Sequence, residues 1–199
     1  MRVIAGTARG TRLRTLDGTD VTRPTVDRVK EAMFSSVQFM LGGARVLDLF
    51  AGSGQLGIEA LSRGAQDCVF VDEDRAAAAV VRANCAAAGV QDRARVTNTS
   101  AQAYLHSCRQ TFDLVLLDPP YRAGTVQEVL PLVERVLSPG GVVLAETEYG
   151  CKLPETCGSL KLAKQYKYGT VAVTRYEKSV PLPWNRRRRY ENRDLPRQL

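Results

Sequence analysis

Short apolar runs of strand length alternate with stretches of helical periodicity through most of this chain, and this alternation restricts the fold more than any other feature. The apolar runs predict strands at residues 44–50, 68–72, 94–97, 112–117 and 142–146. Helical patterns lie between them at residues 55–63, 74–88, 100–107 and 125–137. Because parallel strands are joined through such helices, this order predicts an α/β fold with a doubly wound, parallel sheet.

The two ends of the chain add further elements to this sheet. Residues 2–4 and 11–14, connected through Gly6 and Gly10, predict an N-terminal β-hairpin, and an apolar stripe over residues 25–41 predicts a helix that begins after Pro24. Residues 160–166 and 170–176 predict a closing hairpin. The expected architecture is a seven-stranded, mostly parallel sheet with an antiparallel last strand. We expect a hairpin arm at 1–22, the α/β domain at 23–178 and a basic tail at 179–199.

The motif Asp118-Pro119-Pro120-Tyr121 directly follows the apolar run 112–117. Ligands bind at the carboxyl ends of strands in open α/β sheets. The two prolines fix φ and remove two N–H donors, which leaves the carbonyls of Asp118 and Pro119 as acceptors beside a carboxylate and an aromatic ring. A nucleobase taken out of its stack would offer an amine to these acceptors and a π face to Tyr121. A proline-rich turn after a core strand is the alternative interpretation.

A glycine-rich turn connects the strand at 44–50 to the helix at 55–63. Gly52, Gly54 and Gly57 match G-x-G-x-x-G, and Asp72 stands 20 residues after Gly52, so a dinucleotide-binding enzyme must be considered. Two carboxylates favour S-adenosylmethionine instead. Asp48 precedes the turn and can bind an ammonium group, and Asp72, which could otherwise only cap the next helix, can accept both ribose hydroxyls.

The positive charge of the chain is concentrated at its two ends. The net charge is +7, residues 1–30 carry seven Arg or Lys and three Asp, and residues 178–199 carry seven Arg or Lys and two acids. A nearly neutral body with cationic ends is typical of a protein that binds nucleic acid through phosphates and recognises a base in a pocket. The run Arg186–Arg189 could equally be a solubilising tail.

Cysteine, histidine and apolar patterns argue against several other classes. The five cysteines have no C-x-x-C spacing, and the single histidine, His106, has no Cys or His at ligand spacing, so we expect neither disulfides nor a metal site. The sequence contains no secretory signal and no apolar run of membrane-spanning length. We therefore expect a cytoplasmic protein.

Four sequence blocks resemble the RsmD family of 16S rRNA (guanine-N2)-methyltransferases. They are DLFAGSGQLGIEAL at 48–61, DPPY at 118–121, RVIAGTARG at 2–10 and RPTVDRVKEAMF at 23–34. This resemblance covers roughly residues 1–178 and implies a class I methyltransferase (Rossmann-like) fold. It also implies methyl transfer from S-adenosylmethionine to the N2 amine of a guanine in 16S rRNA, within the small ribosomal subunit or its assembly intermediate, by a protein that we expect to be a monomer.

Together, the motifs and the resemblance give three groups of expected site residues. The catalytic group is Asp118, Pro119, Pro120 and Tyr121. The cofactor-binding group is Asp48, Phe50, Ala51, Gly52, Ser53, Gly54, Asp72, Glu73, Ser100, Ala101 and Asp118. The RNA-binding group is Arg2, Arg9, Arg12, Arg23, Arg28 and Arg122.

Two segments depart from the family pattern. Ser100 stands where the family commonly has an Asp that binds the adenine amine, and a hydroxyl accepts that hydrogen bond more weakly. The tail at 181–199 resembles nothing in the family pattern. An adenine-N6 DNA methyltransferase would use the same acceptor chemistry, and a non-catalytic rRNA-binding assembly factor is a further alternative. The arginine-rich N-terminal blocks argue against the first, and the intact motif at Asp118 argues against the second.

The expected chemistry is chiefly positioning. The Asp118 carboxylate and the Pro119 carbonyl would accept the N–H groups of guanine N2, and Asp118 would take the proton after transfer. Tyr121 would stack on the base.

Overall fold

The computed structural model describes residues 1–16, 24–120 and 124–180. Some residues with roles expected from the sequence lie outside these described ranges, namely Arg23, Tyr121, Arg122 and the tail at 181–199. None of the helices in these ranges is long and apolar enough to span a bilayer.

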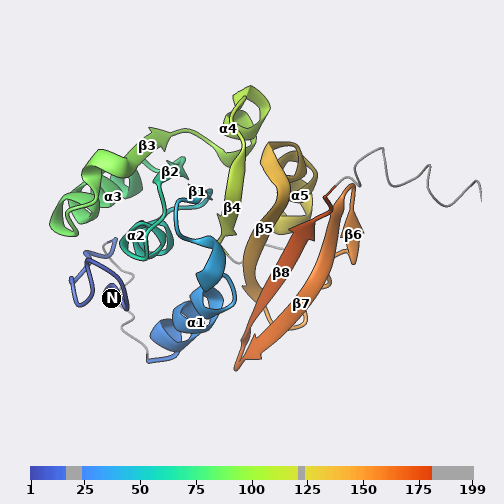
Figure 1. The fold of residues 1–199 in the computed structure, drawn as a ribbon, viewed down its shortest axis with the longest axis horizontal. Helices are drawn as coiled ribbons and strands as arrows, with labels where there is room; N and C mark the ends of the chain where they lie inside the picture. The colour runs from blue at the N-terminus through green and yellow to red at the C-terminus, as the bar shows by residue number, and fades with distance from the viewer. Residues whose placement is uncertain (17–23, 121–123, 181–199) are drawn as a thin grey trace, which may run out of the picture.

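A single mixed sheet of eight strands forms the centre of the molecule, in the order β3-β2-β1-β4-β5-β8-β7-β6 (Figure 1). Five strands run parallel: β1 Arg45–Asp48, β2 Asp67–Asp72, β3 Ala94–Asn98, β4 Phe112–Leu117 and β5 Leu137–Glu148. The last three are antiparallel: β6 Thr156–Cys157, β7 Leu160–Tyr168 and β8 Val171–Lys178. The predicted α/β sheet with an antiparallel closing hairpin is confirmed.

The predicted number of seven strands is too low by one. The additional strand, β6, has only two residues, which pair with Leu160 and Lys161 of β7. A pair of residues is too short to show the alternation that marks a strand in a sequence.

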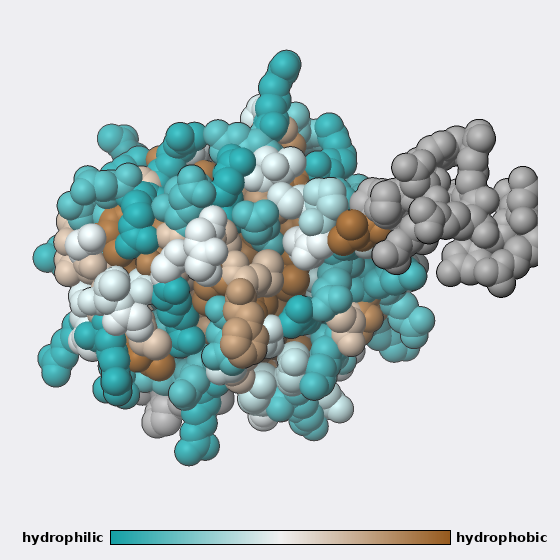
Figure 2. Space-filling view, viewed as in Figure 1, coloured by the Kyte–Doolittle hydropathy of each residue, from teal (hydrophilic) through white to brown (hydrophobic). Residues whose placement is uncertain are grey.

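Helices cover both faces of the sheet, which buries the apolar side chains of both (Figure 1). One face packs against α1 Pro24–Ser35, α2 Gln55–Ser62 and α3 Arg75–Ala87, and the other against α4 Ala101–Ser107 and α5 Thr125–Val136. Two short 3-10 helices, η1 Gln38–Met40 and η2 Gln91–Arg93, complete the described elements. The exterior in this view is largely hydrophilic, with apolar side chains gathered near its middle (Figure 2).

The first helix is shorter than the predicted range of 25–41. It ends at Ser35, and the chain then turns into η1. The Ser36 hydroxyl donates to the Met33 carbonyl, a side-chain bond that competes with helix continuation. Val37 and Leu41 are nevertheless buried, so the apolar stripe continues beyond the helix that it predicts.

The N-terminal segment, residues 1–16, packs on the domain. Its predicted hairpin is reduced to one isolated bridge between Arg2 and Arg12. Val3, Ala8 and Leu13 are buried in the same core cluster as α1 and α2. These contacts place the beginning of the chain against α1 and α2.

Candidate active site

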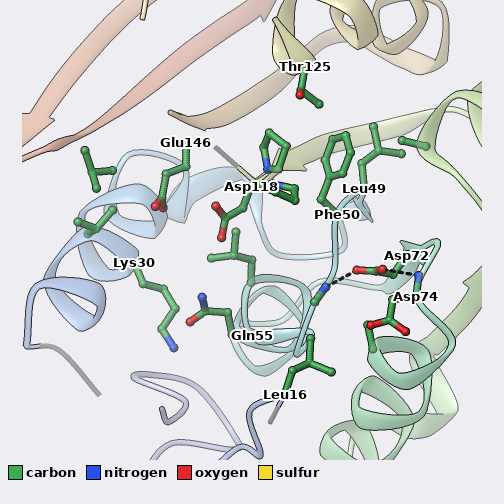
Figure 3. Close-up of a pocket in the computed structure, with 18 of the residues that line it drawn as sticks. Leu16, Lys30, Leu49, Phe50, Gln55, Asp72, Asp74, Asp118, Thr125 and Glu146 are labelled. Atoms are coloured by element: carbon green, nitrogen blue, oxygen red, sulfur yellow. Dashed lines mark hydrogen bonds between the residues drawn. The ribbon is translucent and has the colours of Figure 1, made fainter. Parts of the chain in front are cut away.

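A cavity of about 1250 Å³ opens where the parallel strands end at their carboxyl termini (Figure 3). Its wall includes residues that follow β1, β2 and β4, together with parts of α1, α5, β5 and the N-terminal segment. The cavity is larger than the roughly 300–1,000 Å³ typical of a pocket for one small ligand. It therefore has room for a cofactor and for part of a second molecule.

The glycine turn between β1 and α2 depends on the absence of side chains. Gly52 and Gly54 have φ values of 53° and 78°, which L-residues with a side chain rarely adopt. At Gly57, a Cβ atom would lie 2.3 Å from the Phe70 ring, so this glycine allows α2 to approach β2 closely. Gly52 lines the cavity, whereas Gly54 is the N-cap residue of α2.

Asp48 lies beneath this turn and is not part of the cavity wall. It is 1% exposed, and its carboxylate accepts a hydrogen bond from the Gly57 N–H at 2.9 Å. Burial is the main cause that raises the pKa of Asp48 to about 7; the Gly57 hydrogen bond opposes the rise and the negative charge of Asp72 adds to it. The predicted contact of Asp48 with an ammonium group stays a prediction.

Asp72 ends β2 and faces the cavity. One carboxylate oxygen accepts from the Gly52 N–H at 2.8 Å and the other from the Asp74 N–H at 2.9 Å, as the dashed lines in Figure 3 show. Each oxygen keeps a further lone pair that ribose hydroxyls can use. Asp72 thus fixes the glycine turn and presents an acceptor edge to the cavity. The helix that follows is capped instead by Asp74, which accepts from the Ala76 N–H.

The other predicted cofactor residues divide into two groups. Phe50, Glu73 and Ala101 line the cavity, whereas Ala51, Ser53 and Ser100 do not. The Ser100 hydroxyl caps α4 by accepting from the Ala103 N–H at 3.2 Å. The second lone pair of this hydroxyl is available to accept a hydrogen bond from an adenine amine, and that contact stays a prediction.

Asp118, Pro119 and Pro120 continue directly from β4 into the cavity wall. In Figure 3 the Asp118 carboxylate points into the cavity, toward the side chain of Glu146 from β5. Burial raises the pKa of Asp118 well above its usual range, and the charges of Glu146 and Asp48 raise it further. The higher pKa makes the ionised carboxylate a stronger base than an ordinary aspartate.

Several residues of the wall were not among those expected from the sequence, and they include the polar residues Glu146, Lys30 and Gln55. Glu146 follows a buried run at the end of a strand, the same signal that identified Asp118, so its position could have been predicted. Lys30 could not have been, because its role depends on a distant partner: it is 1% exposed and forms an ion pair with Glu59 at 3.5 Å. The buried Gln55 Oε1 has no hydrogen-bond partner within the described part of the chain.

The predicted RNA-binding arginines that the structure describes are all exposed. Arg2, Arg9 and Arg12 lie on the N-terminal segment and Arg28 lies on α1. Arg2 also pairs with Asp27 at 3.3 Å. The same segment contributes Met1 and Leu16 to the cavity wall, so its positive charge lies on an element that borders the site.

Comparison with known proteins gives matches over most of the chain. The family model described as Conserved hypothetical protein 95 matches residues 1–177. YlbH of Bacillus subtilis is 41% identical over 183 residues, covering 89% of this chain and 99% of YlbH. Ribosomal RNA small subunit methyltransferase D of Escherichia coli is 34% identical over 182 residues, covering 90% of this chain and 91% of that protein.

A solved structure agrees with this assignment. The Escherichia coli protein yhhF superimposes with a TM-score of 0.81 at 34% identity, covering 90% of this chain and 98% of that one. The matched model, the level of identity and the shared fold agree with the resemblance seen in the sequence blocks. The chain belongs to the family of Conserved hypothetical protein 95, the RsmD family.

Proposed function

We propose that this chain methylates the exocyclic N2 amine of a guanine in the 16S RNA of the small ribosomal subunit, with S-adenosylmethionine as the methyl donor. The observation that carries the proposal is the position of Asp118. Its carboxylate, with the carbonyl-rich Asp-Pro-Pro turn, faces the same cavity as the Asp72 carboxylate and the glycine turn. An amine acceptor site and a nucleoside site therefore share one enclosed space.

The residues of the cavity fit S-adenosylmethionine. Gly52 has no side chain to block the approach of a ligand to the turn, and Asp72 offers acceptors for the ribose hydroxyls. Phe50 and Ala101 supply apolar surface for the adenine ring. Bound there, S-adenosylmethionine would supply a methyl group already activated by its sulfonium sulfur.

The chain itself has to hold and deprotonate the amine. The Asp118 carboxylate and the Pro119 carbonyl would accept the two N–H groups of guanine N2, which favours pyramidal nitrogen and stabilises its developing positive charge. The Asp118 carboxylate, which its raised pKa makes a stronger base than an ordinary aspartate, would take the leaving proton.

The partner and the setting follow from this substrate. The exposed arginines are suited to bind RNA phosphates: Arg2, Arg9, Arg12 and Arg28. Three residues outside the described ranges would also contact the RNA: Arg23, Tyr121 and Arg122. Ribosomal subunits are assembled in the cytoplasm, where we place the protein. Since a single chain encloses the cavity, we propose that it acts as a monomer.

The Asp118→Asn variant tests the proposal by separating chemistry from cofactor binding. Loss of one preorganised charge at the reacting amine should lower kcat by about 10²–10³-fold. Affinity for S-adenosylhomocysteine, measured by calorimetry, should change little. The exposed Asp92→Asn serves as the control. Full methyl transfer to small subunits by Asp118→Asn would refute the assigned role.

A further inference from the structure

Glu146 lies beside Asp118 because of the register of the sheet. Leu117 of β4 pairs with Ala145 of β5 in a parallel ladder, so the next residue of each strand is Asp118 and Glu146. Neighbouring strands lie about 4.8 Å apart, and side chains at equivalent positions point to the same face. Both carboxylates therefore project on the face covered by α1 and α2, and Figure 3 shows both in the cavity.

Lys30 also belongs to the cavity wall. The Lys30 ammonium pairs with Glu59 and donates to the Arg2 carbonyl, and in Figure 3 it points away from the two carboxylates. Two neighbouring carboxylates in one cavity can each accept a hydrogen bond from a ligand that brings adjacent donors.

The Watson–Crick edge of guanine is such a ligand. It carries N1–H and the N2 amine next to each other, whereas adenine has an acceptor at N1 beside its amine. A carboxylate opposite N1 attracts guanine and repels adenine. Resting on the function proposed above, we infer that Glu146 accepts the N1–H of the target guanine while Asp118 binds its N2 amine, so that Glu146 selects guanine.

The test compares guanine with 2-aminopurine, which keeps the N2 amine and has an acceptor at N1. Small subunits are reconstituted with either base at the methylated position. The wild-type protein should strongly prefer guanine. In Glu146→Gln, the amide can donate to N1 of 2-aminopurine, so the ratio of the two kcat/KM values should fall by about 10-fold or more, the scale of one charged hydrogen bond.

The control is Glu148→Gln, an exposed glutamate of the same strand outside the cavity wall, which should leave the ratio unchanged. An unchanged ratio in Glu146→Gln, or an equal loss on both bases, would overturn the inference while leaving the proposed function intact. If the wild-type protein transfers no methyl group to guanine, the proposed function itself is wrong.

A second inference comes from the outer strands on the same face. Glu146 pairs with Val173 of β8, and Val173 pairs with Tyr166 of β7. Tyr166 is therefore in register with Glu146, two strands away, and its side chain is on the same face of the sheet. Lys164, Tyr166 and Tyr168 alternate along β7 and share this face. Lys164 Nζ lies 4.9 Å from the Tyr166 ring centroid, and the two tyrosine rings stack at 6.5 Å.

This stripe leads into the cavity. The cavity wall includes the turn between β7 and β8, Gly169 and Thr170, and the first residue of β8, Val171. Lys164 is exposed, and both tyrosines are partly exposed. Aromatic rings interleaved with a cation are suited to stacked bases and their phosphates. Again resting on the proposed function, we propose that the Lys164–Tyr166–Tyr168 stripe binds the RNA strand next to the target guanine.

Tyr166→Ala should weaken binding of small subunits about 5- to 150-fold, the loss of one base stack. Lys164→Ala should flatten the log–log salt dependence of binding by roughly 0.7–0.9. For both variants, KM should rise while kcat and S-adenosylhomocysteine affinity stay near wild type. The control is Lys167→Ala, a lysine of the same strand on the opposite face, where it lies over Tyr149. Unchanged binding in Tyr166→Ala and Lys164→Ala, or an equal effect of Lys167→Ala, would refute the stripe.

Discussion

Asp48 makes the stability of this protein depend on pH. Its folded-state pKa is about 7, against an ordinary value of 3.8. Between these values the folded protein keeps a proton on Asp48 that the unfolded chain has released, so the contribution of Asp48 to stability is greatest at low pH and is lost as pH rises from about 4 to 7. The cause is burial of the carboxylate under the glycine turn.

Asp48→Asn should remove this dependence, because the amide is neutral and its oxygen can still accept the Gly57 N–H. The slope of the unfolding free energy between about pH 4 and 7 should become less negative, by up to about 1.4 kcal/mol per pH unit. Denaturant unfolding at several pH values measures this slope. Identical slopes for the variant and the wild type would show that Asp48 does not titrate there.

Asp72 is the residue on which the assignment of the nucleoside site depends. Asp72→Ala removes the acceptor edge in the cavity and should weaken S-adenosylhomocysteine binding by about 1.5–3 kcal/mol, the scale of hydrogen bonds to a charged group. Asp92→Ala, at an exposed aspartate outside the cavity wall, is the control and should leave the affinity unchanged. Calorimetry that gives equal affinities for wild type and Asp72→Ala would contradict the assignment.

At the scale of elements, a buried polar cluster attaches the N-terminal segment to α2. Glu59 is fully buried and accepts from the backbone N–H groups of Ile4 at 2.8 Å and Ala5 at 3.0 Å. It also pairs with Lys30 and with Arg63 at 2.7 Å. Burial lowers the pKa of Lys30 in spite of this partner, so its positive charge depends on Glu59.

Glu59→Gln should leave the buried Lys30 charge uncompensated and lower the unfolding free energy by about 3–5 kcal/mol. Hydrogen exchange at the amides of Ile4 and Ala5 should accelerate more than in the central strands. The exposed Glu155→Gln is the matched control. A melting temperature equal to that of wild type would show that the cluster does not hold the segment.

Elements with a strong local signal were predictable from the sequence. The five parallel strands and the helices between them follow from long apolar and helical patterns, and the turn at Gly52 and the strand end at Asp118 follow from motif chemistry. The end of α1 at Ser35 depends on local competition from a side-chain hydrogen bond, and the two-residue β6, which pairs with the next strand β7, is too short to show an alternating pattern. The attachment of residues 1–16 to Glu59 is a long-range contact, which no local pattern contains.

At the scale of the whole molecule, the sheet brings the parts of the site together. β1, β2 and β4 end at one edge, which places the glycine turn, Asp72 and Asp118 around one cavity, and β5 adds Glu146. The antiparallel strands extend the same face outward past Tyr166. The carboxyl edge of the sheet and the face beside it therefore bring together the proposed nucleoside site, the proposed amine site and the proposed surface for the flanking RNA.

The most direct test of this account is to identify the methylated nucleoside. Small subunits from cells that lack the protein are incubated with the purified chain and S-adenosylmethionine carrying a labelled methyl group, and the RNA is digested and analysed by mass spectrometry. The account predicts label in a single N2-methylguanosine of the small-subunit RNA, which should appear about 10²–10³-fold more slowly when Asp118→Asn replaces the wild type. Label in N6-methyladenosine, or no label in the RNA, would contradict it.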